Sequence, residues 1–370
     1  MRYIRQQILP EIGARGQALL GRAHVLAAGA GGLGAPALLY LAAAGIGRLT
    51  IADGDTVSLT NLQRQVLFTE EDLEQNKAVA ARARLEALNS SITVRAVPRP
   101  VDADNVMALI QPADVVLDCT DTHAARFLLN DACVKDGKPL VWAALAGWQA
   151  QAGVFDARKG PCRRCLYPAP PERQAGCADT GILGMAAAMA GSMMALETVK
   201  LLLGEETCGA HGLASLSGSV WSLDARTLQS RVDRVEKDSA CPVCARPSSE
   251  ISLQGLPAPV HCGRNPVREV DAPAALALPG AVFVDVRPPG QASAAPVQGA
   301  LQIPWDTATA AEPLDALPRH RPYVVFCTAG EASRLAAAAM GEHGFAEVYH
   351  LRGGLLRWSS AFPTHVLSSR

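Results

Sequence analysis

Short apolar runs alternate with segments of helical periodicity in the N-terminal part of the chain. After a helical segment at the start, the predicted strands are HVLAA, RLTIAD, TVRAV, VVLDCTD and PLVWAA, with helices from Ala35, from Lys77, near Val106 and near Phe127 between them. Alternating strands and helices are typical of an α/β fold. The pattern predicts a Rossmann-like, mostly parallel sheet with helices on both faces.

A long apolar helix is predicted between two further strands, AGVF and SVWSLD. Its sequence, LGMAAAMAGSMMALETVKLLLG, approaches the length of a membrane span. Its many small residues, together with Glu197 and Lys200, favour burial inside a protein. We therefore predict no transmembrane segment and no membrane partner.

A change of composition divides the chain. The stretch SSEISLQGLPAPVHCGRNP is rich in Pro, Gly and Ser and has no clear periodicity. Beyond it a second, short α/β pattern appears in AVFVDVR, PYVVFC, a helix through SRLAAAAMGEHG, and EVYHL. The predicted organisation is a first domain over 1–248, a linker over 249–266 and a second, smaller α/β domain over 267–370.

Charge and cysteine usage narrow the function classes. Lys and Arg number 34 against 35 Asp and Glu, a net charge of -1 that provides no basic excess for nucleic acid. The N-terminus, MRYIRQQILPEIG, lacks the apolar core of a secretory signal, which predicts a cytoplasmic protein. The ten cysteines are then expected to be thiols, metal ligands or catalysts before disulfides.

A glycine-rich loop follows the first predicted strand. It reads GAGGLG, contains Gly29, Gly31, Gly32 and Gly34, and precedes a helix; Asp53, at the end of the next strand, could hold ribose hydroxyls. Such a loop can cradle the pyrophosphate of NAD or the phosphates of ATP, because both need backbone N–H groups at a helix N-terminus. The loop alone does not choose between these nucleotides.

Residues beyond Asp53 favour phosphoryl chemistry. Asn61, Arg64 and Lys77 follow it, and cations neutralise the charge that develops on phosphoryl oxygens, whereas hydride transfer needs no such pair. Asp121, at the carboxyl edge of the predicted sheet, could hold Mg²⁺. Alternatively, Arg64 and Lys77 are solvated charges, Asp121 caps a helix starting near His123, and the glycines only permit a tight turn.

Two C-x-x-C pairs predict a metal site. Cys162 and Cys165 lie in PCRRC, and Cys241 and Cys244 lie in CPVC. Two such pairs complete a tetrahedral Cys₄ site without an open position, which is how structural zinc is held. A redox dithiol is the alternative, but that chemistry needs one pair at a helix start.

Cys177 lies between these pairs in the stretch YPAPPERQAGCADTGILG, which we expect to be irregular. A thiol there could attack an acyl-adenylate or receive sulfur, or it could be an ordinary exposed thiol. Cys119 and Cys133 show no partner pattern and are expected in the core.

Cys327 ends an apolar strand in VVFCTAGEASRLAAAA, before a short loop and a helix starting near Ser333. Loop N–H groups and the helix N-terminus favour a thiolate there and could cradle a persulfide. With VDVR, GALQIPW and GFAEVYHLRGGLLRW, residues 267–370 resemble a rhodanese domain. Ala332 stands where the rhodanese loop C-x-x-G-x-R-S commonly has arginine, which weakens attraction for anionic thiosulfate, and a partly degenerate module stays an alternative.

The first 248 residues resemble the MoeB/ThiF adenylyltransferases, which are related to ubiquitin-activating (E1) enzymes. The resemblance rests on RYIRQ, GAGGLG, D-x-D-x-V-x-x-x-N-L-Q-R-Q, the lysine and DCTD. It implies a homodimer that uses MgATP to adenylate the C-terminal glycine of a ubiquitin-like sulfur carrier of the MoaD/ThiS type, ending in Gly-Gly. By position, the resemblance implies that Gly32 and Asp53 contact the nucleotide and that Asn61, Arg64 and Lys77 contact its phosphates. It further implies Mg²⁺ at Asp121 and structural Zn²⁺ at the four cysteines. Cys177 has a debated functional role in the family, and Arg5 is implied to reach into the other subunit's site.

Together these features predict adenylation of a carrier followed by sulfur transfer from a Cys327 persulfide, loaded by a donor such as a cysteine desulfurase, to form a thiocarboxylate. The sequence does not identify the pathway, with molybdopterin and thiamine biosynthesis among the candidates. A nicotinamide-dependent oxidoreductase with a sulfurtransferase domain is one alternative, although it leaves Arg64, Lys77 and the cysteine pairs unexplained. An inactive scaffold that binds the carrier is the other.

Overall fold

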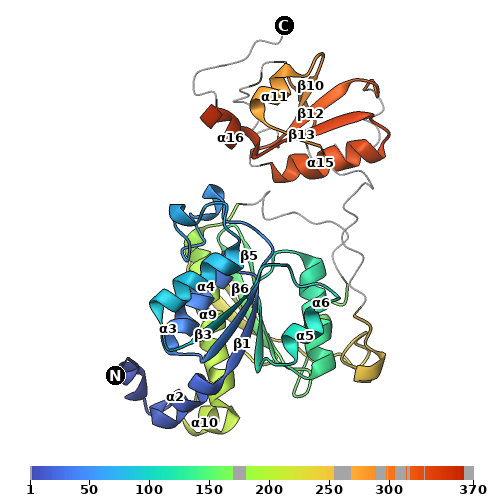
Figure 1. Cartoon of the computed structure of the whole chain (residues 1–370). Coiled ribbons are helices and arrows are strands. Elements are labelled where there is room, and N and C mark those ends of the chain that lie inside the picture. Colours follow the sequence, from blue (N-terminus) through green and yellow to red (C-terminus); the bar gives the residue numbers. More distant parts are fainter. Residues whose placement is uncertain are drawn as a thin grey trace. The chain divides into compact units, whose positions relative to one another are not determined.

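The computed structural model describes residues 2–169, 181–253, 268–288, 297, 299–304, 314, 317–328 and 330–361. By its internal contacts the chain divides into two compact units, Met1–Pro257 and Ala258–Arg370. Each unit has its own sheet and its own hydrophobic core (Figure 1). The two units are therefore described separately.

An eight-stranded sheet in the order β3-β2-β1-β4-β5-β6-β7-β8 forms the centre of the first unit. Its strands are β1 (His24–Ala28), β2 (Arg48–Ala52), β3 (Thr93–Val97), β4 (Val115–Asp118), β5 (Leu140–Ala146), β6 (Gln149–Phe155), β7 (Ser219–Asp224) and β8 (Gln229–Arg234). The five strands from β3 to β5 pair in parallel, and β5 to β8 pair antiparallel. The predicted mostly parallel α/β fold is confirmed.

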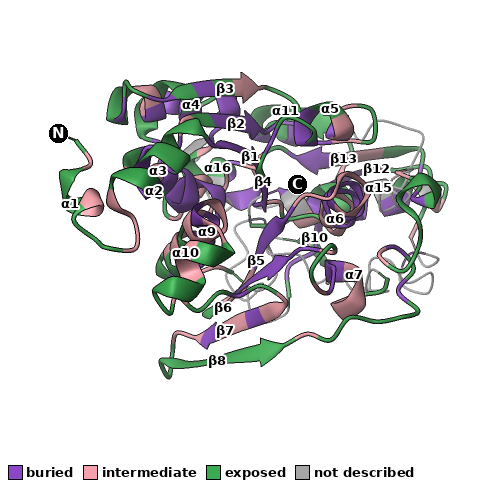
Figure 2. Ribbon diagram, turned by 90° about the horizontal axis from the view of Figure 1, so that it is seen from below, coloured by how far each residue is buried: buried purple, intermediate pink, exposed green. Residues whose placement is uncertain are grey.

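Helices cover both faces of this sheet, as the burial of every residue of β1 requires. Val25 and Ala27 point into a core shared with α2, α3, α4 and α9, whereas Leu26 and Ala28 face α5 and α6. Figure 2 shows the central strand β1 buried and the edge strand β8 exposed. The helical segments are α1 (Ile4–Gln7), α2 (Gly13–Arg22), α3 (Gly34–Ala44), α4 (Lys77–Leu88), α5 (Val106–Ile110), α6 (His123–Asp136), α7 (Arg163–Leu166), α9 (Gly184–Leu203) and α10 (Glu205–Ala210), with short 3₁₀ turns η1 (Leu59–Asn61), η2 (Glu70–Asp72) and η3 (Ser248–Glu250).

Local signals explain where the helices next to the candidate site begin and end. α3 follows the glycine loop and ends at Gly45, whose φ of 85° is left-handed. α4 begins at Lys77 because the Asn76 side chain accepts hydrogen bonds from the N–H groups of Ala78 and Val79. The predicted helix start at Lys77 is therefore confirmed.

Helix α9 is long and apolar enough to cross a membrane by length and composition alone. In the structure it packs against α3, β5 and β6, and half of its apolar window is buried. Glu197 on this helix is fully buried, and its carboxylate accepts hydrogen bonds from Lys200, Ser215 and the N–H of Leu216. These contacts are those of a core helix.

The second unit has a five-stranded parallel sheet in the order β11-β10-β12-β13-β9. Its strands are β9 (Arg268–Val270), β10 (Val282–Asp285), β11 (Leu301–Gln302), β12 (Pro322–Phe326) and β13 (Glu347–Leu351), and its helices are α11 (Ala272–Ala277), α15 (Glu331–Glu342) and α16 (Gly354–Ala361). Separate apolar clusters cover its two faces, so the predicted second α/β pattern is confirmed.

Candidate functional site

The carboxyl ends of β1, β2 and β4 meet at one edge of the first sheet, because these neighbouring strands run parallel. The glycine loop follows β1, Asp53 follows β2, and the turn that leads to Asp121 follows β4. Ligands of open α/β sheets bind outside this edge. Parallel pairing therefore gathers three of the predicted site segments.

Two glycines allow the loop to pack against the end of β4. Gly29 has a φ of 97°, and a Cβ atom there would lie 2.7 Å from the Cys119 carbonyl oxygen. A Cβ on Gly34, the first residue of α3, would lie 2.3 Å from the Gly29 carbonyl oxygen. The loop is thus closed tightly at both ends. Its N–H groups and those of the first turn of α3 form the kind of site that holds phosphate.

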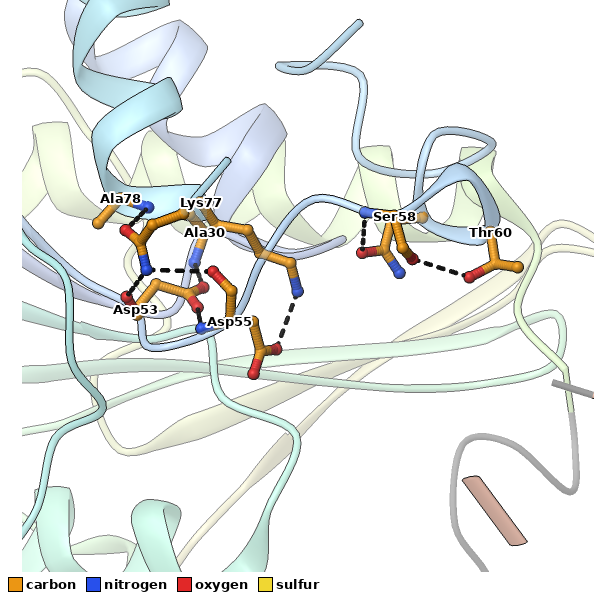
Figure 3. Close-up of polar contacts among 9 residues, drawn as sticks. Ala30, Asp53, Asp55, Ser58, Thr60, Lys77 and Ala78 are labelled. Atoms are coloured by element: carbon orange, nitrogen blue, oxygen red, sulfur yellow. Dashed lines mark hydrogen bonds and ion pairs between the residues drawn. The ribbon is translucent and has the colours of Figure 1, made fainter. Parts of the chain in front are cut away.

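Asp53 and Lys77 lie on either side of Asp55 (Figure 3). The buried Asp53 carboxylate accepts hydrogen bonds from the N–H groups of Ala30, at 2.7 Å, and of Asp55, at 2.8 Å. Burial raises the pKa of Asp53, whereas the bond from Ala30 and the charge of Lys77 oppose the rise. The Lys77 Nζ lies 2.9 Å from the Asp55 carboxylate, and its side chain is only 8% exposed. Lys77 is therefore not a solvated surface charge.

Arg64 lies directly over the glycine loop. A Cβ on Gly32 would come within 3.4 Å of the Arg64 Cγ, and one on Gly31 within 3.5 Å of the Gln65 amide nitrogen. Arg64 Nη1 donates to the carbonyl oxygen of Thr60, 3.0 Å away. The aliphatic part of Arg64 therefore packs at van der Waals distance from Gly32, and the Gln65 side chain lies next to Gly31.

Asn61 and Arg5 do not meet the loop as directly. The Asn61 side-chain oxygen accepts a hydrogen bond from the N–H of Ser58, so it closes the η1 turn. Arg5 lies exposed on α1. That segment is anchored near the C-termini of α3 and α4, since a Cβ on Gly45 would collide with the Tyr3 ring. Within one chain, Arg5 therefore lies toward the amino ends of the strands, away from the glycine loop.

Asp121 lies in the turn between β4 and α6 rather than at the strand end, which corrects the predicted strand boundary. β4 ends at Asp118, whose carboxylate accepts hydrogen bonds from the Thr120 N–H, at 3.1 Å, and hydroxyl, at 2.6 Å, and so turns the chain. Thr122, not Asp121, caps α6. Asp121 is exposed and makes no hydrogen bond or ion pair with another described residue. Its carboxylate is free to bind a cation.

The four cysteines of the two C-x-x-C pairs converge. Their sulfur atoms all lie within 4.8 Å of one another, with Cys162 3.6 Å from Cys241 and Cys165 3.4 Å from Cys244. Tetrahedral zinc with Zn–S bonds near 2.3 Å would separate sulfurs by about 3.8 Å, so the set fits this ion. Burial, and after it the neighbouring thiols, raises the pKa of Cys162. Four thiolates in this place therefore need a bound cation to stabilise their negative charge.

The other cysteines differ in their surroundings. Cys119 and Cys133 are buried in the first unit, as expected of core residues. Cys177, the predicted acyl carrier or sulfur acceptor, lies outside the described residues.

Cys327 follows β12 and faces the start of α15. Its Sγ accepts hydrogen bonds from the N–H groups of Gly330, at 3.1 Å, and Ser333, at 3.4 Å. A Cβ on Gly354 would lie 2.4 Å from the Cys327 carbonyl oxygen, so α16 closes the cradle tightly. The helix begins at Glu331, two residues earlier than predicted. Ala332 packs into the apolar core of this unit and provides no charge.

Asp55 and Asp118 are two residues of the site whose roles appear only in the structure. Asp55 pairs with Lys77, and Asp118 fixes the turn before Asp121. A local signal exists for Asp118, since it is a carboxylate at the end of an apolar strand. The Asp55 contact joins residues 22 positions apart and depends on the tertiary fold.

Comparisons with known proteins agree for both units. A model of the ThiF family matches residues 3–243, and a rhodanese-like domain model matches residues 271–361. A sulfur carrier protein adenylyltransferase of Thermus thermophilus is 42% identical over 66% of this chain and 90% of its own length. The probable adenylyltransferase/sulfurtransferase MoeZ of Mycobacterium tuberculosis is 36% identical over 97% of this chain and 92% of its own. An adenylyltransferase and sulfurtransferase MOCS3 of Anopheles gambiae is 43% identical, over 75% of this chain and 61% of its own length.

Solved structures agree with the fold. Escherichia coli MccB with ATP superposes with a TM-score of 0.57 over 66% of this chain and 75% of its own, at 22% identity. A likeness at that identity shows the fold alone. The match of the family model over most of the chain, and MoeZ over nearly all of it, confirm the resemblance seen in the sequence. The chain belongs to the ThiF family and carries a C-terminal rhodanese-like domain.

Proposed function

We propose that this enzyme adenylates the C-terminal glycine of a ubiquitin-like sulfur carrier ending in Gly-Gly and then converts that carboxylate into a thiocarboxylate. The observation that carries the proposal is the sheet edge of the first unit. There a glycine loop at the start of α3, the buried Asp53 and the cations Arg64 and Lys77 come together in a ThiF-family chain. A site for hydride transfer has no use for two cations beside the phosphate loop.

Each residue of this edge has a proposed task in adenylation. Asp53 accepts hydrogen bonds from the ribose hydroxyls, and the glycine loop donates its N–H groups to the phosphates. Arg64 and Lys77 neutralise the charge that develops when the carrier carboxylate attacks the α-phosphorus and pyrophosphate leaves. Asn61 helps to hold the loop that carries Arg64. Arg5 is proposed to complete the site of a second subunit, in a homodimer.

Two metal ions are proposed, each with a different task. Mg²⁺ would be held by the Asp121 carboxylate and the ATP phosphates, where it offsets phosphate charge. Asp121 is exposed and has no partner in the part of the chain that the structure describes, which supports this role. Zn²⁺ would be held by Cys162, Cys165, Cys241 and Cys244 and would stabilise the fold, because four thiolates leave no open position.

Cys327 is the proposed sulfur donor. The terminal sulfur of a Cys327 persulfide attacks the acyl carbon of the carrier adenylate, AMP leaves, and an acyl disulfide forms. A thiol then attacks the S–S bond, which releases the thiocarboxylate and leaves a disulfide at Cys327. The N–H groups of Gly330 and Ser333 around Sγ support an anionic sulfur at this position. Cys177 is proposed to take part in an acyl or sulfur intermediate.

The remaining assignments complete the proposal. Residues 1–248 would form the adenylyltransferase domain, 249–266 the linker and 267–370 the sulfurtransferase domain of a cytoplasmic enzyme. A protein persulfide, such as that of a cysteine desulfurase, would load Cys327. The absence of a cation at Ala332 supports this choice over thiosulfate, because an anionic donor finds less attraction there.

Carrier-dependent ATP–pyrophosphate exchange tests adenylation directly. With a purified MoaD/ThiS-type carrier, wild-type enzyme should exchange labelled pyrophosphate into ATP, and carrier lacking its last glycine should not. Asp121→Ala should abolish exchange while the protein stays folded. A fully active Asp121→Ala enzyme would contradict the magnesium assignment, and a folded wild-type protein that is inactive with several carriers would favour a scaffold.

A further inference from the structure

One arginine of the first unit is buried without a hydrogen-bond acceptor for its charge. Arg163 begins α7, is 3% exposed, and its guanidinium bonds to no other described residue. The guanidinium carbon lies 5.0 Å from the ring centre of Phe127, 5.3 Å from Trp142 and 5.0 Å from Tyr167. Aromatic faces attract a cation, but they do not neutralise it.

Asp118 is a buried opposite charge that acts on this guanidinium. It is fully buried at the end of β4 and is in register with Trp142 on the neighbouring strand β5, so both side chains share a face of the sheet. The two charges form no direct ion pair. Burial lowers the pKa of Arg163 to about 10, and the charge of Asp118 opposes that fall. Each of these charges would be uncompensated without the other.

Asp118 also holds the turn that leads to Asp121. One carboxylate oxygen, Oδ1, accepts both hydrogen bonds from Thr120. Arg126 on α6 also bonds to Thr120: its Nε and Nη2 donate to the Thr120 carbonyl oxygen at 3.1 and 2.9 Å. Thr120 is therefore fixed by both its N–H and its carbonyl, and the next residue is Asp121. The Asp118 carboxylate therefore helps to fix the position of Asp121.

Polar atoms around this cluster are buried without a partner in the described part of the chain. They are Asp118 Oδ2, His123 Nδ1, Trp142 Nε1 and Arg163 Nε. Unsatisfied buried groups destabilise a fold, so a group of them in one place needs a reason other than packing. All four lie on the segments beneath or beside the Asp121 turn: the end of β4, the start of α6, β5 and α7.

We propose that Arg163 is a positioning residue for adenylation: its buried guanidinium balances the buried Asp118 carboxylate, which accepts the hydrogen bonds from Thr120 that hold the turn carrying Asp121. The inference rests on the proposed function of that turn. Arg163 is not proposed to touch the nucleotide or the carrier. It acts through Asp118 and Thr120, and its neighbour Cys162 ties it to the cysteine cluster.

The test compares Arg163→Met, Asp118→Asn and the double variant in the full-length protein. Each single change leaves one buried charge alone and should raise the KM for MgATP in pyrophosphate exchange on the order of tenfold, with a smaller change in kcat, because outer-sphere partners of a metal site act on its affinity. The double variant removes both charges and should lie closer to wild type than either single variant. Arg163→Lys, which keeps the charge, should lie close to wild type.

Arg164→Met is the matched control. Arg164 lies on the same helix, stacks 4.3 Å from the Phe127 ring and pairs with Asp131, so its loss should lower the melting temperature without changing the KM for MgATP. The proposal would be overturned if Arg163→Met also lowered the melting temperature without changing the KM for MgATP. It would likewise be overturned if the effects of the two single variants on this KM simply added in the double variant. If Arg163→Met fails to fold, the KM for MgATP of Asp118→Asn tests the proposal instead: an unchanged value would overturn it. If wild type shows no exchange, the proposed function fails, and MgATP affinity by calorimetry still tests Arg163.

Discussion

At the scale of single residues, Lys77 is one of the two cations proposed to neutralise charge on the phosphates. Its ammonium group is buried beside Asp55 at the sheet edge, where charge–charge interactions are stronger than in water. Lys77→Met should lower carrier-dependent pyrophosphate exchange by about 10²–10³-fold, the usual cost of removing one charge-stabilising donor. The control is Lys159→Met, which removes a lysine from an exposed pair with Glu205 and should leave exchange unchanged. Equal activities of the two variants would contradict the role of Lys77.

His24 makes stability depend on pH. Its Nδ1 donates to the Pro112 carbonyl oxygen and its Nε2 accepts from the Thr50 hydroxyl, an arrangement of the neutral ring. Burial lowers the pKa of His24; the hydrogen bond to Pro112 opposes this fall, and the positive charge of Arg48 adds to it. The unfolded chain then binds more protons, so the contribution is complete above pH ~6.5 and is lost as pH falls below it.

Thermal unfolding of wild type and His24→Gln between pH 7.5 and 5.5 measures this contribution. Wild type should lose more stability over that range than the variant does. Identical losses in both proteins would show that His24 is protonated equally in the folded and unfolded chains.

At the scale of elements, local sequence predicted most of the helices and parallel strands. The Asn76 cap and the apolar runs before Asp53 and Cys327 are short-range signals, and the structure follows them. Strand β8 was not predicted, because all six of its residues are exposed and no apolar alternation marks it. β4 ends earlier than the apolar run predicts, because hydrogen bonds from Thr120 to Asp118 turn the chain before Asp121.

The candidate site was predictable in its residue types but not in its contacts. C-x-x-C spacing predicts which cysteines form a pair, and the fold is needed to bring the two pairs together over 79 positions. Arg64 over Gly32 and Lys77 beside Asp55 are likewise tertiary contacts. The cluster of Arg163 and Asp118 has no sequence motif, because only the fold brings the start of α7 and the end of β4 next to Trp142.

The cysteine cluster links two distant elements, because it joins the segment after β6 to the segment after β8. Cys241→Ser should remove bound zinc and lower the melting temperature on the order of 10 °C, since metal binding free energy is also folding free energy. Metal content by mass spectrometry and thermal unfolding measure the two effects. Cys208→Ser, outside the cluster and half-buried, is the control. A Cys241→Ser protein with wild-type zinc content would contradict the assignment.

At the scale of the whole molecule, the proposed homodimer brings Arg5 into a second subunit's site. Three apolar residues beside it on the N-terminal segment, Ile4, Ile8 and Leu9, are about half exposed or more, which suits a subunit contact. Co-expressed Arg5→Ala and Lys77→Met chains should then regain activity, because a mixed dimer has one intact site and one doubly altered site. Random pairing predicts about a quarter of wild-type exchange. No recovery, or a monomeric wild type by light scattering, would contradict the shared site.

The whole chain is proposed to combine adenylation of the carrier with sulfur transfer to it, and a single measurement tests both activities. A MoaD/ThiS-type carrier ending in Gly-Gly is incubated with ATP, Mg²⁺, a cysteine desulfurase with cysteine, a thiol reductant and the enzyme, and its mass is then determined. Wild type should form the carrier thiocarboxylate only when ATP is present, and Cys327→Ser should stop at adenylation. Thiocarboxylate formed equally by Cys327→Ser, or formed without ATP, would contradict the account.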